Sequence, residues 1–92
     1  MADPVARKVR LYGRVQGVFF RQWLVHQARE LGVAGWVRNA PDGSVEAHVE
    51  GDETVVEKMI EAMSQGPTNA RVEDLMVEDA DVEEISGFAV RI

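Results

Sequence analysis

The segment from Leu11 to Arg21, LYGRVQGVFFR, combines two glycines, a run of backbone amides and an arginine in a spacing suited to binding an anion. Gly13 and Gly17 can adopt backbone angles closed to other residues, so the N–H groups that follow can curl into a concave nest. The Arg21 guanidinium has a planar fork that can grip two phosphate oxygens. The segment therefore predicts a phosphate site, although a glycine-containing loop with a solvated arginine is an alternative that a single short motif leaves open. The residues of the predicted cradle are Val15, Gln16, Gly17, Val18, Phe19 and Phe20.

Other catalytic side chains are scarce. The chain has no cysteine, so a thiol nucleophile is excluded. His26 lies off the apolar stripe of its predicted helix and His48 on the polar side of its predicted strand, and we expect both to be solvated. Neither lies at a spacing suited to metal ligation, so the chain predicts no metal and no cofactor. The loop also lacks the Lys-Ser or Lys-Thr ending of a nucleotide-binding P-loop.

The loop is framed by a strand and a helix. Strict alternation over residues 8–15 predicts a half-buried strand with Val9, Leu11, Gly13 and Val15 on its apolar face. A helix follows, because apolar residues recur at spacings of four, four and three, and these are Phe20, Leu24, Ala28 and Leu31. The N-terminus of this helix adds unpaired N–H donors and a partial positive charge to the loop.

The rest of the chain predicts four further long elements and one short strand. Residues 33–39 and 44–50 predict a hairpin, and Asp52 predicts the cap of a second helix that stops at Gly66. The apolar stripe of that helix is Val56, Met59, Ile60 and Met63. Residues 71–79 predict a strand with a bulge or a register break, and residues 88–92 a closing edge strand with Phe88, Val90 and Ile92 on one face.

The order βαββαβ plus a short strand predicts a split βαβ arrangement, an α+β sandwich with two helices on one face of an antiparallel sheet. In this arrangement the first two strands run parallel with the third between them, and their C-terminal ends lie roughly 10 Å apart at one edge. The predicted cradle and Asn39 end those two strands, so we expect them to face each other. Alone, Asn39 is more typical of a turn residue before Pro41.

Composition limits the partners. The net charge of −6 argues against general binding to nucleic acid or to an anionic membrane. Residues 1–41 carry seven basic and two acidic residues, a net +5, whereas residues 42–92 carry three basic and fourteen acidic residues, a net −11. We therefore expect the anion site in the first part, and we interpret the acidic second part mainly as solvated surface.

Length and hydropathy predict a single domain over residues 1–92, with residues 1–6 as a loose tail. No hydrophobic run is long enough to span a bilayer, and MADPVARK lacks the apolar core of a signal peptide, which favours the cytoplasm. We expect a monomer, because no exposed apolar seam is evident.

The two segments LYGRVQGVFFR and GWVRNAPDGSVEAHVEG resemble the signature segments of the acylphosphatase family, in the same order and at a matching separation. GPTNARV and the terminal GFAVRI resemble that family's pattern as well. The resemblance implies a ferredoxin-like fold and metal-free hydrolysis of carboxyl phosphates. It also implies that Arg21 binds the phosphate, that Asn39 orients the attacking water and that the main chain of residues 15–20 holds the phosphate. Ala40 departs mildly from the pattern, since many members have Thr or another side chain after the asparagine.

The absence of an evident general acid or metal-ligand spacing is consistent with such a substrate. An alkyl phosphate expels an alkoxide and normally needs an acid or a metal, whereas an acyl phosphate expels a carboxylate whose conjugate acid has a pKa of about 4 to 5. Positioning and charge stabilisation are then sufficient, so we expect direct attack of water on phosphorus. The physiological acyl phosphate stays open.

Several other functions compete with this hypothesis. A non-catalytic regulatory or binding module on the same fold is the main alternative. An RNA-binding domain shares the strand order, but the chain has no run of aromatic residues on a central strand and has the wrong net charge. A metal chaperone of the usual form would need a CxxC motif, and carbamoyl transfer would need further domains.

Overall fold

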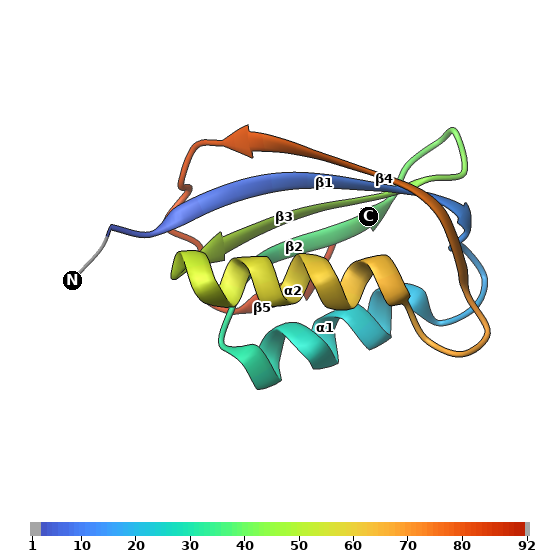
Figure 1. Ribbon diagram of the computed structural model, residues 1–92, viewed down its shortest axis with the longest axis horizontal. Helices are drawn as coiled ribbons and strands as arrows, with labels where there is room; N and C mark the ends of the chain where they lie inside the picture. Colours follow the sequence, from blue (N-terminus) through green and yellow to red (C-terminus); the bar gives the residue numbers. More distant parts are fainter. Residues whose placement is uncertain (1–2, 92) are drawn as a thin grey trace.

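The computed structural model describes residues 3–91, which form two helices and five strands in the predicted order. Figure 1 shows both helices lying on one side of the sheet, which confirms the predicted α+β sandwich. The elements are β1 (Val5–Arg14), α1 (Phe20–Leu31), β2 (Ala34–Asn39), β3 (Val45–Gly51), α2 (Glu53–Gln65), β4 (Arg71–Ala80) and β5 (Phe88–Val90).

The strands are arranged in the order β4-β1-β3-β2-β5. Strand β3 lies between β1 and β2 and is antiparallel to both, so β1 and β2 run parallel and end at the same edge, as expected. The four long strands pair antiparallel as the sequence predicted, and the added strand β5 pairs with β2 in parallel, which makes the whole sheet mixed. This is the ferredoxin-like fold with one short strand added.

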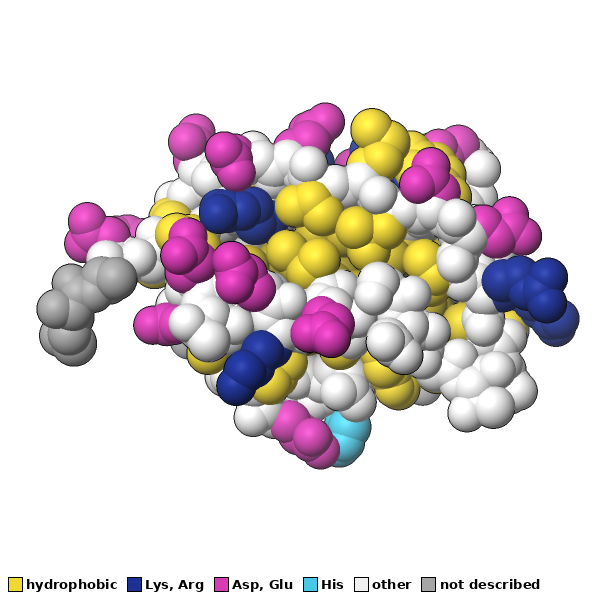
Figure 2. Space-filling view, in the orientation of Figure 1, with side chains coloured by type: hydrophobic (Ala, Val, Ile, Leu, Met, Phe, Trp, Pro, Cys, Tyr) yellow, Lys and Arg dark blue, Asp and Glu magenta, His cyan; other side chains and the backbone are white. Residues whose placement is uncertain are grey.

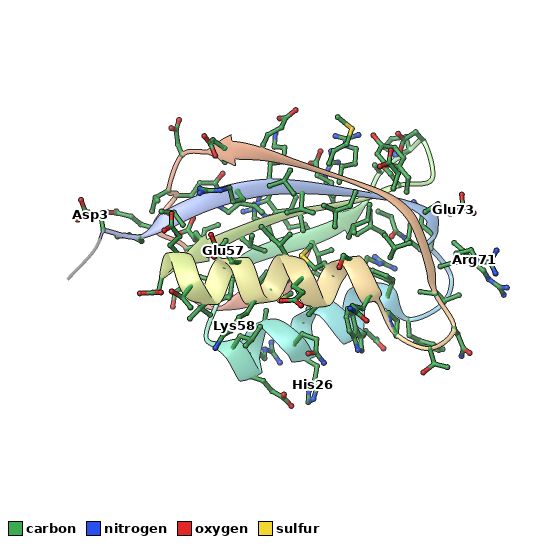
Figure 3. All side chains as sticks on the ribbon, in the orientation of Figure 1. Asp3, His26, Glu57, Lys58, Arg71 and Glu73 are labelled. Carbon is green, nitrogen blue, oxygen red and sulfur yellow. The ribbon has the colours of Figure 1, made fainter. Side chains whose placement is uncertain are left out.

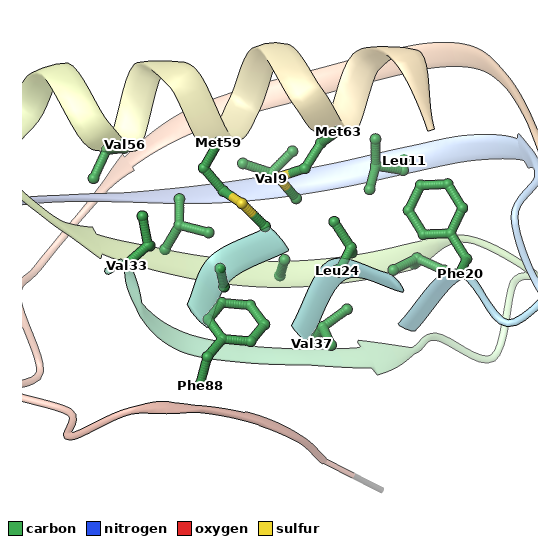
Figure 4. Close-up of a cluster of buried hydrophobic side chains, with 14 of the residues drawn as sticks. Val9, Leu11, Phe20, Leu24, Val33, Val37, Val56, Met59, Met63 and Phe88 are labelled. Carbon is green, nitrogen blue, oxygen red and sulfur yellow. The ribbon is translucent and has the colours of Figure 1, made fainter. Parts of the chain in front are cut away.

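The core lies between the sheet and the two helices (Figure 4). Each helix contributes buried side chains at the predicted helical spacing. The strands contribute every second side chain, because successive strand residues point to opposite faces of the sheet. Helix α1 buries Phe20, Leu24 and Ala28, and helix α2 buries Val56, Met59 and Met63. The Asp52 carboxylate caps α2 by accepting a hydrogen bond from the Thr54 N–H at 2.9 Å, as predicted.

The predicted irregularity near the start of β4 is a bulge opposite Gly13. The pairing with β1 shifts between Tyr12 and Gly13, so Glu73 has no direct partner. Gly13 has a φ of +122°, and a Cβ placed there would lie 2.3 Å from the Arg71 carbonyl oxygen. The bulge therefore brings the two backbones closer than any residue with a side chain would allow.

The N-terminal strand is longer than expected. Strand β1 begins at Val5 and not at Lys8, Val5 pairs with Gly51, and Ala6 is buried. Residues 5–6 thus belong to the sheet, and the expectation of a loose tail over residues 1–6 is wrong for them. Residues 1, 2 and 92, including the predicted inward position of Ile92, lie outside the described residues. Within residues 3–91, neither helix is both long and apolar enough to cross a membrane.

The burial of His48 is the largest departure from what the sequence predicted. The His48 side chain points to the face of β3 away from the helices, but it is 2% exposed and not solvated. Its ring stacks beside Trp36 with a centroid separation of 6.1 Å, and its Nε2 lies 2.7 Å from the Glu50 Oε1. Alternation correctly predicted which face of the sheet His48 is on. His48 is nevertheless buried, because neighbouring side chains and the segment between β4 and β5 cover that face locally.

Candidate active site

A cavity of about 510 Å³ opens at the end of the sheet where β1 and β2 finish. Figure 1 shows that the β1–α1 loop and the β2–β3 turn gather at this end. The cavity is lined by Val15, Gly17, Phe19, Phe20, Arg21, Gln22, Asn39 and Val90. Arg21 and Asn39, 18 positions apart in the sequence, therefore share one cavity, as the topology predicts.

The loop before α1 has the backbone angles of a nest. Gly17 has a φ of 74° and Phe19 a φ of 59°, so two positions of the loop are left-handed. Phe19 is also the N-cap of α1 and contributes no side-chain cap. Within residues 3–91, the backbone N–H groups of residues 16–20 have no hydrogen-bond acceptor. These donors are therefore available to an anion.

Gln16 has a role that the sequence did not predict. Its side-chain Nε2 donates hydrogen bonds to the Ala40 carbonyl oxygen at 3.0 Å and to the Ser44 carbonyl oxygen at 2.9 Å. Both acceptors belong to the β2–β3 turn, which begins directly after Asn39. Gln16 thus ties the cradle to the turn that presents Asn39, so its side chain supports the site while its backbone remains in the loop. Of the other predicted cradle residues, Val18 does not line this cavity and lies against a neighbouring hollow.

Arg21 lies in the first turn of α1 and lines the cavity. No carboxylate of the described residues forms an ion pair with it. The helix N-terminus adds partial positive charge at the same place. The full charge of the guanidinium therefore remains available to a ligand.

Asn39 ends β2 on the face that carries the helices, and its side chain lines the same cavity. Its Oδ1 atom is buried and has no hydrogen-bond partner among residues 3–91. An unpaired buried acceptor is costly, and half a turn of the amide exchanges its oxygen for the nitrogen at almost no change in shape. Asn39 therefore retains both a donor and an acceptor for a group bound in the cavity.

The turn after Asn39 is held by its own polar contacts. The Ser44 hydroxyl and the Ser44 N–H both donate to the Asp42 Oδ1. These hydrogen bonds, with the nearby Arg10 guanidinium, hold the pKa of the Asp42 carboxyl below its usual range. The turn is therefore a fixed support for Asn39 and an anchor for Gln16.

Val90 and Gln22 also line the cavity, although the sequence did not predict either of them as a site residue. Val90 is 42% exposed and pairs with Val37 in the parallel β2–β5 ladder, two residues before Asn39. The alternation of residues 88–92 predicted which face of the sheet Val90 is on. The parallel register that brings Val90 to the cavity is not indicated by any local sequence pattern.

The two histidines lie away from the cavity. The His26 side chain is 68% exposed and pairs with Glu30 one helical turn later, which confirms that it is solvated. Over the part of the chain that the structure describes, no three His, Asp or Glu side chains are grouped to hold a metal ion.

The chain matches the family model for acylphosphatase over residues 7–90. It is 51% identical over 86 residues to an acylphosphatase of Thermococcus kodakarensis, covering 94% of each chain. The structure superposes on the acylphosphatase of Bacillus subtilis with a TM-score of 0.92 at 32% identity, covering 96% of this chain and 99% of the other. An acylphosphatase from Coxiella burnetii gives a TM-score of 0.92 at 36% identity, covering 97% and 94%.

Motif, fold and cavity thus agree with similarity that extends over nearly the whole chain. This chain belongs to the acylphosphatase family, whose members are enzymes that hydrolyse acyl phosphates.

Proposed function

We propose that this chain hydrolyses the carboxyl-phosphate bond of small acyl phosphates by direct attack of water on phosphorus. Arg21 and the backbone of residues 15–20 hold the phosphate, and Asn39 positions the water. The observation that carries the proposal is the shared cavity, in which an unpaired arginine, a loop of free N–H groups and an unpaired amide come together.

The cradle and Arg21 act on the phosphoryl group. The transferred group carries negative charge on its nonbridging oxygens, and fixed N–H donors stabilise it without rearranging during the reaction. The fork of Arg21 adds bidentate hydrogen bonds and fixes the orientation of the group. Together they hold phosphorus so that its far side faces Asn39.

Asn39 acts on the nucleophile. Its amide accepts a hydrogen bond from water and donates one, which orients a lone pair of the water toward phosphorus. An amide is not basic enough to remove a proton, so an oxygen of the bound phosphate accepts it. The P–O bond to the acyl group breaks, and the carboxylate leaves as a stable anion that needs no proton donor.

The test is the hydrolysis of benzoyl phosphate, followed by ultraviolet absorbance in excess chelator, by the unmodified chain and by Asn39→Ala. We expect the unmodified chain to hydrolyse benzoyl phosphate and not an alkyl phosphate. Asn39→Ala should lower kcat by about 100- to 1,000-fold, the usual effect of losing one positioned hydrogen-bonding group. Its affinity for inorganic phosphate, measured by calorimetry, should change little.

Loss of phosphate binding in a folded Asn39→Ala variant would instead make Asn39 a phosphate ligand or a structural residue. Absence of hydrolysis by the folded unmodified chain would favour a binding module that keeps the cradle without the chemistry. The monomeric state, the cytoplasmic location and the lack of nucleic-acid partners stay predictions.

A further inference from the structure

A second basic hollow adjoins the cavity on the other side of the cradle. It has a volume of about 480 Å³ and is lined by Arg14, Gly17, Val18, Phe19, Thr68, Asn69, Ala70 and Arg71. Gly17 and Phe19 line both this hollow and the cavity that contains Arg21. The two spaces therefore adjoin across the segment of residues 17–19.

Arg14 and Arg71 are direct cross-strand partners at the end of the β1–β4 ladder. Like charges directly opposite each other destabilise a sheet. The bulge at Gly13 creates this juxtaposition, because it shifts the register by one residue immediately before Arg14. The chain thus places two arginines opposite each other although it carries 16 acidic residues that could have been placed opposite either one.

Neither arginine is neutralised. Within residues 3–91, the arginines without a carboxylate, carbonyl or aromatic partner are Arg14, Arg21 and Arg71. All three border the cradle, whereas the arginines elsewhere have partners. Glu73 is close in sequence, but it does not line the hollow, and Figure 3 shows its side chain leaving β4 in a different direction from that of Arg71.

The surroundings also favour an anion. Thr68 and Asn69 add a hydroxyl and an amide to the hollow, and none of the described residues that line it carries a carboxylate. Figure 2 shows Lys or Arg side chains at the end of the molecule where Figure 3 labels Arg71, with an acidic side chain beside them. Gly17 has no side chain to separate this hollow from the cavity.

We infer that Arg14 and Arg71 form a second anion subsite, which takes a carboxylate or phosphate at the far end of the acyl group. The inference rests on the proposed function, because the first phosphate must sit beside Arg21. It predicts a preference for acyl phosphates with a second anionic group over those without one. Such a substrate crosses the cradle at Gly17 and reaches both basic sites.

The test compares 3- and 4-carboxybenzoyl phosphate with the corresponding methylbenzoyl phosphates, at an ionic strength of about 0.1 M. The variants are Arg14→Gln and Arg71→Gln, with Lys58→Gln on α2 as a control that removes the same charge elsewhere. For at least one isomer, each arginine variant should lower the ratio of kcat/KM for the carboxy substrate to that for the methyl substrate by about three- to fivefold, as for an exposed ion pair. Hydrolysis of the methyl substrates should stay within about twofold, and Lys58→Gln should leave the ratio unchanged.

An unchanged ratio for both isomers would overturn the subsite. An equal decrease for carboxy and methyl substrates would also overturn it, because that result is diffuse attraction of any phosphate. If the unmodified chain hydrolyses neither substrate, the proposed function fails separately. Calorimetry then tests the subsite with the matching ketophosphonates, in which a methylene replaces the bridging oxygen. The ratio of the Kd for the carboxy ligand to the Kd for the methyl ligand should rise in the arginine variants.

Discussion

Arg21 combines two sources of positive charge at one point of the cavity. Its guanidinium lies in the first turn of α1, where the partial charge of the helix N-terminus and the free N–H groups of residues 16–20 also point to an anion. Among residues 3–91, no other charged side chain lines this cavity. At the scale of the residue, we therefore expect phosphate binding to depend on the shape of the Arg21 guanidinium as well as on its charge.

Arg21→Lys should lower kcat/KM for benzoyl phosphate by about 10- to 100-fold, because an ammonium keeps the charge but loses the bidentate fork. Inorganic phosphate should also bind more weakly by calorimetry. Arg29→Lys is the matched control, since Arg29 lies on the same helix and does not line the cavity. Activity retained within a few-fold by Arg21→Lys would count against Arg21 as the phosphate ligand.

The site depends on two elements, the cradle and the β2–β3 hairpin, which are joined by the side chain of Gln16. Its two hydrogen bonds cross from the loop to the carbonyl oxygens of Ala40 and Ser44. Small displacements of a positioned reactant reduce the rate strongly. At the scale of the element, we therefore expect Gln16 to act as a positioning residue that sets the distance between the cradle and Asn39.

Gln16→Ala should lower the free energy of unfolding by about 1–2 kcal/mol, because two side-chain hydrogen bonds are lost. It should also lower kcat/KM by about tenfold. Urea unfolding and the benzoyl phosphate assay measure the two effects, and Gln65→Ala, at the exposed end of α2, serves as the control. A loss of stability with full activity would make the tether purely structural.

At the scale of the whole molecule, Glu50 ties the β4–β5 connection to the sheet at the end opposite the cavity. The connection between β4 and β5 leads from one edge of the sheet to the other, and the Glu50 carboxylate accepts hydrogen bonds from the Glu83 N–H at 2.9 Å and the Ile85 N–H at 3.0 Å. Burial alone would raise the pKa of Glu50, but these bonds and the one with His48 together hold its pKa below the usual value. The ionised carboxylate therefore anchors the connection that carries β5, and with it Val90, to the central strand.

Glu50→Gln should lower the free energy of unfolding at pH 7 by about 2 kcal/mol, since an amide leaves one of the donors without an acceptor. Because the pKa of Glu50 is lower in the folded state, its contribution is complete above the unfolded value of about 4.5 and is lost as the pH falls through the folded value. The difference between the two proteins should therefore shrink below about pH 4.5. Urea unfolding from pH 7 to pH 3 measures it, with Glu57→Gln on the exposed side of α2 as control. Parallel curves over the whole range would contradict this role.

Local pattern was sufficient for much of the fold. Helical spacing predicted both helices, Asp52 and Gly32 predicted their ends, and alternation predicted the inward faces of β1 and β3. The register break near Gly13 was expected because the apolar residues of β4 do not keep one phase. These features depend on neighbours close in the chain, and a sequence displays them directly.

The candidate site was predicted through topology. Once the strand order was inferred, Arg21 and Asn39 had to lie at the same edge of the sheet, and the family resemblance named both. The side-chain tether of Gln16, the parallel register that brings Val90 to the cavity and the burial of His48 were not predicted. Each of them depends on a contact between segments far apart in the sequence.

The sequence by itself thus determined the elements, the strand order and the chemical character of the site, because periodicity, capping and residue type act over a few positions. The tertiary structure alone decided which free N–H groups, carbonyl oxygens and guanidinium groups meet. It placed Arg14 beside Arg71 through one bulged residue, and it buried Glu50 beneath a connection more than thirty residues away. Such contacts depend on the strand register and on the path of the connecting segments. A register shift of one residue would turn the side chains to the other face of the sheet without altering the local sequence pattern.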